Sequence, residues 1–499
     1  MKTYKEKVDR IICLGLDIGS SSAKCAAFSI EGEMLAESTV EYNKLLTNKA
    51  DELFSYVCTV IRDCAGKIKD NGDIASITVS SFGESFAAVD RRGSALSDIV
   101  TYSESWGEGE VDLLLRKVPD IGRIAGANPK TFYALPKIMC LLKTRPEIKS
   151  DLWKFLQIMD FIIYRLSGET VIDYALACRA LAFDVINRRW SDEILAAAGI
   201  GKDTLSDPVP AGTIAGEIRE SLARSLGVPA NTKIIAGAHD QVATAIGAGV
   251  LSAGEAVIGT GSVECITPVF DHPILEPGFL EKNYACIPHA VHGKYVTYAF
   301  SMTGGALLSW FRDTLAIHLN AAAQAQGRSV YDLLNESCPP QPSDLLVIPH
   351  FGGTGTPELN QKAAGTITGF TLDTGLPDIY RAVLEGLCFE MRYNREQIAD
   401  FGVNFNSLRA TGGGARSDIW LQMKADIIGV PVTPLATANS GLTGGAMLAA
   451  VSLGAYDSLE EAAKKFVKVR DTFYPSDGPK GYYNDKYRRY QTLRNAMLY

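Results

Sequence analysis

Short apolar runs separated by turn sequences at the start of the chain predict a meander of strands. Residues 11–16 and 23–30 are mainly apolar, and a Gly-Ser turn separates them. A second turn at Ile30–Glu33 leads into a third such stretch over roughly residues 34–40. Apolar runs joined by tight turns are typical of antiparallel strands. The spacing of apolar residues then becomes helical over Lys49–Lys69.

Strands and helices alternate through the following residues. The stretch "IASITVSSFGESFAAVD" predicts a buried strand, a loop at Ser81–Ser85 and a further strand. The glycine of "LSGE", Gly168, predicts a helix end. The helices expected in this region lie near residues 109–117, 137–144 and 151–166.

One strand–turn–strand sequence occurs twice. The stretches "DIGSSSAKCAAF" and "VIGTGSVECITP" place Gly19 and Gly259 240 residues apart, close to half of the 499-residue chain. Each copy opens a half that continues with strands and helices. We therefore expect an α/β protein of two domains, residues 1–247 and 248–499. No long Pro- or Ser-rich linker separates them, so they are expected to pack around a cleft.

Length and composition agree with this organisation and exclude some partners. A chain of 499 residues is too long for one compact core. Its 46% hydrophobic and 21% charged residues are ordinary for a soluble globular enzyme. The net charge of −8 disfavours nucleic acid and anionic membranes, because binding their phosphates needs a basic face. No apolar segment approaches the roughly 20 residues needed to span a bilayer.

The cysteines and the first residues predict a cytoplasmic location. The ten cysteines are scattered singly, without a C-x-x-C pair, which favours reduced thiols over a metal site or a disulfide framework. The opening "MKTYKEKVDR" is polar and charged, and the apolar run after it is too short for a signal sequence.

The turn after Asp17 is a candidate phosphate site. Its Gly-Ser sequence presents backbone N–H groups with little steric cover, and the serine hydroxyls add donors. Asp17 is placed to hold Mg²⁺ through water, and Lys24 adds positive charge. A plain hairpin with polar turn residues is the alternative. The second copy at Gly259–Ser262 favours the phosphate interpretation, because two facing hairpins can grip one polyphosphate.

"GAHDQ" places a carboxylate at the end of a strand. Lys233–Ala236 predicts a strand and a helix is expected from about Gln241, so Asp240 lies at the lip between them. Such a carboxylate is well placed for a ligand, and it can act as general base toward a hydroxyl. Alternatively, Asp240 only caps the following helix. His239 is more typical of a packed or hydrogen-bonded histidine.

Three loops add weaker signals. "ATGGGARSDIW" at Ala410–Trp420 has three glycines before a helix, which allow close approach of a ring or a phosphate, but it is neither a dinucleotide fingerprint nor a P-loop. "SSFGES" at Ser80–Ser85 and "YSESW" at Tyr102–Trp106 combine carboxylates, hydroxyls and aromatic rings. That combination suits a polyol, and an ordinary surface loop is the alternative.

These stretches together resemble the FGGY carbohydrate kinases of the actin/hexokinase-like superfamily. The similarity covers nearly the whole chain and keeps the motif order. The motifs that carry it are "GLDIGSSSAK", "GAHDQVATAIGAG", "IGTGS", "SMTGGALLSWFRD", "GTITGFTLDTGLPDIYRAVLEG" and "GGGARSDIWLQMKADIIGVPV". The resemblance implies ATP-dependent phosphorylation of a sugar or polyol hydroxyl with Mg²⁺. It also implies two actin-like, ribonuclease H-like domains that close on the ligands across a central cleft.

The resemblance assigns roles to individual residues. It implies Asp240 as the catalytic base and Asp17 as the Mg²⁺-side carboxylate. The residues implied at the nucleotide are Asp17, Gly19, Ser20, Ser21, Ser22, Lys24, Thr260, Gly261, Gly305, Ser309, Gly413 and Ser417. Those implied at the acceptor are Gly83, Glu84, Tyr102, Phe132, Asp240 and Gln241. A small sugar or polyol is the expected partner, and a homodimer is a candidate assembly.

Departures from the family patterns bear on the acceptor. The loop that reads N-Q-R-E in glycerol kinases is "SFGE" here, so Glu84 keeps the acid while Gly83 replaces the arginine. "AHD" is similar to fuculose and rhamnulose kinases, whereas "DQ" is similar to glycerol kinases. A ketose such as a pentulose, xylulose-like, is the expected acceptor. A deoxyhexulose and a polyol such as glycerol are the alternatives.

Two functions from other classes compete with a kinase. An actin-like ATPase that activates a partner enzyme shares "DIGSSSAK", but such activators tend to be shorter and to carry cluster cysteines. A non-catalytic sugar-binding or filament-forming protein would not need both Asp17 and Asp240. Sugar-dependent release of ADP separates these classes.

Overall fold

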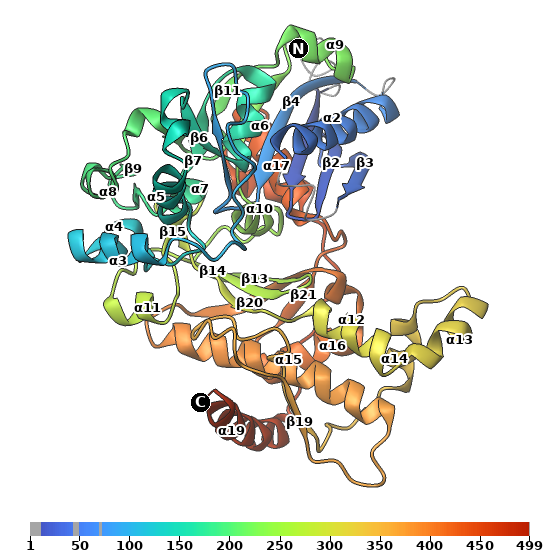
Figure 1. Ribbon diagram of the computed structural model, residues 1–499. Helices are drawn as coiled ribbons and strands as arrows, with labels where there is room; N and C mark the ends of the chain where they lie inside the picture. The colour runs from blue at the N-terminus through green and yellow to red at the C-terminus, as the bar shows by residue number, and fades with distance from the viewer. Residues whose placement is uncertain (1–10, 43–48, 69–71, 499) are drawn as a thin grey trace.

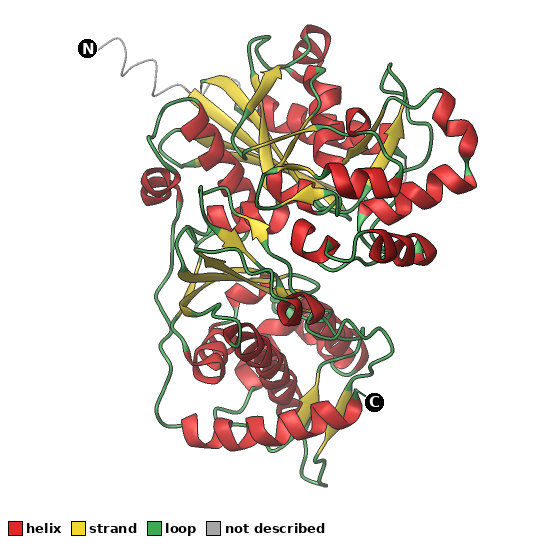
Figure 2. Ribbon diagram, turned by 90° about the vertical axis from the view of Figure 1, so that its left-hand side faces the viewer, coloured by secondary structure: helices red, strands yellow, loops and turns green. Residues whose placement is uncertain are grey.

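The computed structural model of the chain describes residues 11–42, 49–68 and 72–498. Two halves lie one above the other, and each is built around one main sheet (Figure 1). Figure 2 shows the same two layers from the side, with helices on the faces of both sheets. Among the described residues, no helix is both long enough and apolar enough to cross a membrane.

The first sheet has six strands in the order β11-β12-β4-β1-β2-β3. β1 pairs antiparallel with β2 and parallel with β4, and β12 runs parallel to β4. The predicted meander is confirmed, since three consecutive strands fold back on one another through tight turns. The strands are β1 Ile11–Ile18, β2 Ser22–Ser29, β3 Met34–Glu41, β4 Asp73–Ser81, β11 Ile214–Glu217 and β12 Lys233–His239.

The second sheet repeats this pairing. It has seven strands in the order β15-β16-β14-β13-β20-β21, and β17 also pairs with β14. β13 pairs antiparallel with β14 and parallel with β20, as β1 does with β2 and β4. The same pairing in both sheets supports the duplication inferred from Gly19 and Gly259. The strands are β13 Gly254–Thr260, β14 Glu264–Phe270, β15 Ile287–Pro288, β16 Tyr295–Val296, β17 Ala299–Ser301, β20 Phe405–Gly412 and β21 Val432–Pro434.

The remaining elements cover the sheets or form small two-stranded sheets. The helices before residue 250 are α2 Ala50–Lys67, α3 Glu108–Lys117, α4 Ile121–Ala125, α5 Ala134–Thr144, α6 Ile158–Ser167, α7 Tyr174–Cys178, α8 Asp192–Ala198, α9 Glu220–Leu226 and α10 Asp240–Gly247. Those after it are α11 Pro277–Glu281, α12 Gly305–Thr314, α13 Asn320–Ala325, α14 Val330–Ser337, α15 Leu376–Ala399, α16 Asp418–Lys424, α17 Ser440–Ser452, α18 Leu459–Phe466 and α19 Lys480–Met497. The short strands are β5 Phe86–Val89, β6 Lys154–Gln157, β7 Val171–Asp173, β8 Phe183–Asp184, β9 Arg189–Trp190, β10 Asp207–Val209, β18 Leu346–Ile348 and β19 Thr366–Thr368.

One predicted helix is wrong over part of its length. The helix expected over residues 151–166 begins only at Ile158, because Lys154–Gln157 form β6. β6 pairs antiparallel with β5, which lies more than 60 residues earlier in the chain. A short apolar run fits either conformation, and this distant pairing decides for the strand. The end of the helix at the left-handed Gly168 is confirmed. Lys69, the last residue of the helix predicted from Lys49, lies outside the described residues.

Helices α10 and α17 join the two halves. α17 follows the last strand of the second sheet, yet it packs against the first sheet, where it stands out by its colour among the blue strands (Figure 1). Its Leu442 shares one hydrophobic core with Leu14 of β1. A Cβ at Gly15 would overlap the Leu442 carbonyl, and one at Gly247 would overlap that of Ser440. Glycine therefore permits this close approach, which brings the start of α17 next to β1 and α10.

Candidate active site

The turn between β1 and β2 is held in shape by its own backbone and by Tyr42. The Gly19 N–H donates to the Ser22 carbonyl at 2.9 Å, and the Tyr42 hydroxyl donates to the Gly19 carbonyl at 2.5 Å. The Tyr42 N–H donates to the Ser21 carbonyl at 2.9 Å. The predicted Gly-Ser bend is therefore a fixed turn. Tyr42 was missed by the sequence reasoning, because nothing local links it to the turn.

Asp17 places a carboxylate at the end of β1. It lies opposite Lys24 in the β1–β2 register. Burial raises the pKa of Asp17, and the Lys24 ammonium opposes that shift. Its Oδ1 is enclosed and has no hydrogen-bond partner among the residues that the structure describes. A Cβ at Gly441 would lie 3.6 Å from Oδ2. An enclosed oxygen without a donor suits a cation or its water.

Asp240 is the first residue of α10, directly after β12. The N-cap of α10 is His239, whose Nδ1 accepts from the Gln241 N–H at 3.4 Å. The alternative that Asp240 only caps the helix is therefore wrong, because the preceding imidazole takes that place. The Asp240 side chain is 30% exposed to solvent. Burial, and then the charges of Asp17 and Glu84, raise the pKa of Asp240 to about 7. A carboxylate that ionises near neutrality is suited to general-base chemistry.

Glu84 is bound by an arginine that the sequence reasoning missed. The Arg179 guanidinium contacts the Glu84 carboxylate, and both side chains are almost enclosed. Arg179 also lies over the rings of Tyr133 and Tyr298. A Cβ at Gly83 would come within 2.9 Å of Arg179 Cγ, so Gly83 leaves room for the arginine. Glu84 thus lies beside a guanidinium group, that of Arg179, although the residue before it in the sequence, Gly83, is not an arginine. A lone arginine in the apolar run 175–183 was the available signal, because a buried charge needs a partner.

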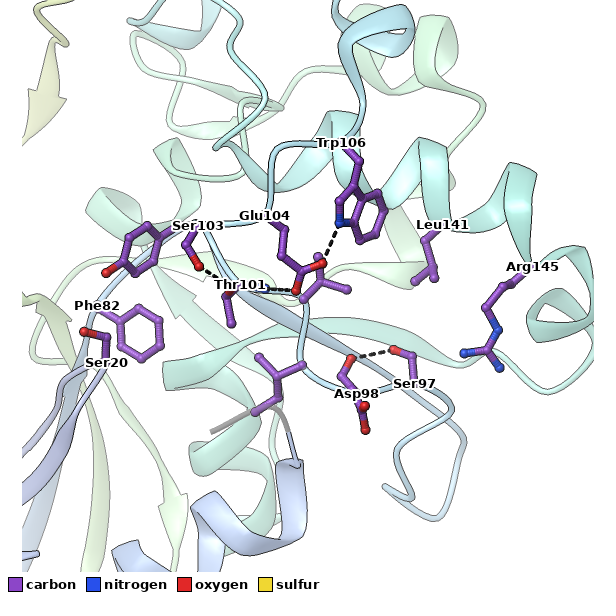
Figure 3. A pocket seen from close by; sticks show the side chains of 13 residues that line it. Ser20, Phe82, Ser97, Asp98, Thr101, Ser103, Glu104, Trp106, Leu141 and Arg145 are labelled. Atoms are coloured by element: carbon purple, nitrogen blue, oxygen red, sulfur yellow. Dashed lines mark hydrogen bonds between the residues drawn. The ribbon is translucent and has the colours of Figure 1, made fainter. Parts of the chain in front are cut away.

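Two further predicted acceptor residues, Tyr102 and Phe132, lie on loops that are both hydrogen-bonded to Lys137. The Lys137 ammonium donates to the Thr101 carbonyl at 2.7 Å and to the Phe132 carbonyl at 2.9 Å, and burial lowers its pKa to about 8. Tyr102 and Ser20 line one cavity of about 500 Å³. Figure 3 shows Ser20 and Phe82 at one end of this cavity and Arg145 at the other. The structure therefore places a predicted acceptor residue beside the first hairpin.

The six nucleotide residues predicted in the second half meet in one cavity. Its volume is about 630 Å³. The Gly305 N–H donates to the Gly261 carbonyl at 2.8 Å, so the start of α12 closes on the second hairpin. Ser417 caps α16 and donates to the Asn335 amide oxygen at 3.2 Å. The six residues are Thr260, Gly261, Gly305, Ser309, Gly413 and Ser417, and the same cavity is lined by Tyr331, Asn335, Tyr380, Arg416 and Trp420, which were not predicted.

Thr260 is supported from inside the second half. Its hydroxyl donates to the Glu264 carboxylate at 2.8 Å and accepts from the Lys424 ammonium at 2.9 Å. Lys424 and Glu264 form a fully enclosed ion pair at 2.5 Å. This pair fixes the end of β13, and it engages the Thr260 hydroxyl on both sides.

The start of α17 lies between the two sets of predicted residues. Lys24 reaches the Asn439 amide oxygen at 3.5 Å. One residue later, the Ser440 hydroxyl lies 3.0 Å from that of Thr411, and Thr411 is the register partner of Gly259 on β13. Asn439 and Ser440 therefore contact β2 of the first hairpin and β20, the strand that pairs with β13 of the second hairpin. Within residues 11–42, 49–68 and 72–498, no group of three or more His, Cys, Asp or Glu side chains is placed to hold a metal ion.

Comparisons with known proteins match the chain along most of its length. Family models of the FGGY family of carbohydrate kinases match residues 12–247 (N-terminal domain) and 254–453 (C-terminal domain). The chain is 26% identical to a xylulose kinase of Bacillus subtilis, covering 93% of the chain and 92% of the relative. It is 27% identical to a gluconokinase of Bacillus licheniformis, covering 92% and 94%. A solved structure of ligand-bound xylulose kinase from Lactobacillus acidophilus superposes with a TM-score of 0.86 at 24% identity, covering 97% of this chain and 98% of that one. The predicted α/β fold is confirmed.

Proposed function

The chain belongs to the FGGY family of carbohydrate kinases, and on that premise we propose that it transfers the γ-phosphoryl group of ATP to a hydroxyl of a ketose such as a pentulose. Membership of the family makes it a phosphotransferase with an alcohol group as acceptor. The observation that carries the proposal is Asp240, a partly exposed carboxylate at a strand end, whose pKa is raised to about 7.

Asp240 is the proposed general base. A sugar hydroxyl is a weak nucleophile near neutral pH, so a carboxylate that takes its proton as the P–O bond forms accelerates the transfer. The raised pKa strengthens Asp240 as a proton acceptor while leaving much of it ionised near pH 7. The acceptor hydroxyl is then held within reach of the Asp240 carboxylate, with Gln241 on the same turn of α10.

The nucleotide is proposed to lie along the second half with its phosphates toward the hairpins. The cavity of about 630 Å³ has glycines at Gly261, Gly305 and Gly413, which allow backbone to approach an adenosine and its phosphates. In the first half, Ser20, Ser21 and Ser22 offer N–H and hydroxyl donors and Lys24 offers an ammonium, while the Gly19 N–H is used within the turn. These two sets of donors support a grip on the triphosphate from opposite sides.

Mg²⁺ is proposed to be held at Asp17 through water. The enclosed Asp17 Oδ1, which lacks a donor from the described residues, fits a cation or its water ligand. When bound, the ion would neutralise charge on the phosphate oxygens. With one protein carboxylate, the remaining ligands have to be water and phosphate, which is the usual arrangement for this ion.

The surroundings of Asp240 favour a neutral acceptor. Arg179, whose charge acts on Asp240, is already paired with Glu84, so it does not offer a free cation to a sugar acid such as gluconate. Glu84, Tyr102, Phe132 and Gln241 suit the hydroxyl groups and C–H faces of a neutral sugar. A pentulose agrees with the name of the Bacillus subtilis relative. A deoxyhexulose or a polyol such as glycerol is the alternative.

A coupled assay of ADP release tests the proposal. A thermal-shift screen of ketoses, aldoses, polyols and gluconate, with and without ATP and Mg²⁺, first selects the acceptor, because a ligand that binds the native state raises its apparent stability. The selected sugar should then drive stoichiometric release of ADP. ADP release that no sugar stimulates would instead point to an ATPase that serves a partner protein.

The oligomeric state and the cellular location of the protein are not needed for the proposed reaction. A homodimer and a cytoplasmic location stay predictions. Light scattering during size-exclusion chromatography gives the mass of the assembly directly, to be compared with 53.8 kDa for one chain.

A further inference from the structure

Two polar groups, a hydroxyl and a backbone N–H, converge on one nitrogen of His239, the residue before Asp240. The Tyr298 hydroxyl lies 2.9 Å from His239 Nδ1. The backbone N–H of Gln241 points at the same nitrogen from 3.4 Å. A backbone N–H can only donate, so Nδ1 has to offer its lone pair. This contact favours the tautomer with the proton on Nε2.

His239 is also held neutral and in a fixed orientation. Burial, and then the charge of Arg179, keep the pKa of His239 well below its usual range. Its ring stacks on that of Tyr298, with centroids 5.2 Å apart and planes 18° apart. Burial raises the pKa of Tyr298 well above its usual range, so this hydroxyl keeps its proton. Tyr298 lies between β16 and β17 of the second sheet, whereas His239 ends a strand of the first.

The Asp240 carboxylate faces this imidazole. Asp240 Oδ1 lies 3.1 Å from His239 Nδ1, and it receives no hydrogen bond within the part of the chain that the structure describes. With the proton on Nε2, the contact brings a lone pair against a carboxylate oxygen. Protonation of Asp240 removes that repulsion. With the proton on Nδ1, the same contact would be a hydrogen bond that stabilises the carboxylate.

We propose that Tyr298 is a positioning residue that fixes His239 in the Nε2–H tautomer and so keeps the Asp240 carboxylate free of a donor from this ring. The inference rests on the proposed role of Asp240 as general base. Tyr298 thereby keeps Asp240 a strong proton acceptor. Because the two residues come from different sheets, this arrangement forms only when the halves are packed together.

Other charged groups around Asp240 do not replace this contact. Asp17 and Glu84 act on it through their charge and favour the protonated form. Arg179 and the Gln241 N–H favour the ionised form. His239 and Tyr298 complete the titratable surroundings, together with Cys265 of β14. The substitution Tyr298→Phe removes only the Tyr298 hydroxyl and leaves the other groups in place.

The test compares Tyr298→Phe with wild type in two measurements. The first is ¹⁵N NMR of the full chain with labelled histidine, in which wild-type His239 should show a bare Nδ1 and the variant should gain a population with the proton on Nδ1. The second is the pH profile of kcat/KM. Its acid limb should move to lower pH by about one to two units in the variant, because a hydrogen bond to a charged group is worth roughly that much. The plateau rate should also fall, because Asp240 becomes a weaker base.

The controls keep this proposal separate from the proposed function. Tyr295→Phe removes the hydroxyl of a buried tyrosine on neighbouring β16 and should leave both measurements unchanged. A wild-type His239 with its proton on Nδ1 would overturn the proposal without any variant, as would an acid limb in Tyr298→Phe that stays in place or moves to higher pH. If Asp240 is not the base, Asp240→Asn retains turnover, which is a different outcome from an unchanged Tyr298→Phe profile.

Discussion

Arg179 binds the Glu84 carboxylate from 95 residues further along the chain, and both side chains are almost enclosed. Glu84 has a left-handed backbone, with φ at +61°, so its side chain leaves the loop in a direction that an ordinary turn would not give. Gly83 leaves space for the arginine beside it. The pair therefore shapes the wall of the proposed acceptor site next to Asp240.

Removing one partner of this pair should destabilise the fold strongly. Arg179→Met leaves the Glu84 carboxylate enclosed without a counter-charge, which generally costs about 3–5 kcal/mol. Urea unfolding measures the loss. The control is Arg145→Met, whose ion pair with Glu147 is exposed, and this variant should lose less than about 1 kcal/mol. If both variants lost the same free energy of unfolding, burial of the Arg179–Glu84 pair would not explain the loss.

Replacement of the proposed base should abolish most turnover without abolishing nucleotide binding. Asp240→Asn keeps the size of the side chain but cannot accept a proton, and loss of a general base typically lowers the rate about 10²- to 10⁴-fold. Steady-state kinetics and ATP titration by calorimetry measure the two effects. Asp192→Asn, at an exposed position on α8, is the control. Near-normal turnover of Asp240→Asn would remove Asp240 from this role.

Activity should rise with pH through about 7. Burial and the charges of Asp17 and Glu84 raise the pKa of Asp240 to about 7, and only the ionised form accepts a proton. A raised pKa therefore moves the acid limb of kcat/KM upward from the range usual for an aspartate. Profiles measured from pH 5 to 9 with an excess of coupling enzymes test this. A rate that is already constant between pH 5 and 7 would show that Asp240 ionises normally.

A side chain at Gly413 should block the nucleotide without harming the fold. A Cβ there meets no atom within 4 Å, and the position lines the proposed nucleotide cavity. Gly413→Val should therefore weaken ATP binding at least about tenfold, or roughly 1.4 kcal/mol. Its melting temperature without ligand should stay close to that of wild type. Gly66→Ala, on the exposed face of α2, should change neither quantity by much. Undiminished ATP affinity would place the nucleotide elsewhere.

A side chain at the neighbouring Gly414 should instead lower the stability of the fold. A Cβ at Gly414 would lie 2.7 Å from both Thr260 Cγ2 and the Trp420 ring. Gly414→Ala should therefore lower the melting temperature, since these neighbours are tightly packed. Together the two glycines separate an effect on the cavity from an effect on the core.

Local pattern predicted the elements whose conformation is decided within a few residues. The turn glycines and apolar runs gave the β1–β2 and β13–β14 hairpins, and the strand-to-helix change at Asp240 gave its position at a strand end. The segment 154–157 was wrongly predicted as helix. Its strand conformation depends on pairing with β5, which is distant in sequence. Pairing across such a distance leaves no trace in the local spacing of apolar residues.

In the site too, residues within local motifs were predicted, whereas residues that act through distant contacts were not. Six residues of the second half were predicted from motifs and lie around one cavity. Arg179, Tyr42 and Tyr298 escaped prediction because each acts through a contact with a residue far away in the chain. Their partners Glu84, Gly19 and His239 had all been considered. A motif therefore locates the chemical group, whereas the residues that orient it become visible only in three dimensions.

The position of α17 on the first sheet has a consequence during synthesis. The last strand of that sheet, β12, ends at His239, but α17, one of the helices that pack on the sheet, begins only at Ser440. At a translation rate of about 5–20 residues per second, the roughly 200 intervening residues take about 10 to 40 seconds to emerge from the ribosome. Throughout that interval the nascent sheet lacks the cover that Leu442 provides in the finished protein. The newly made first half is therefore expected to expose the apolar surface that α17 later covers until the chain is almost complete.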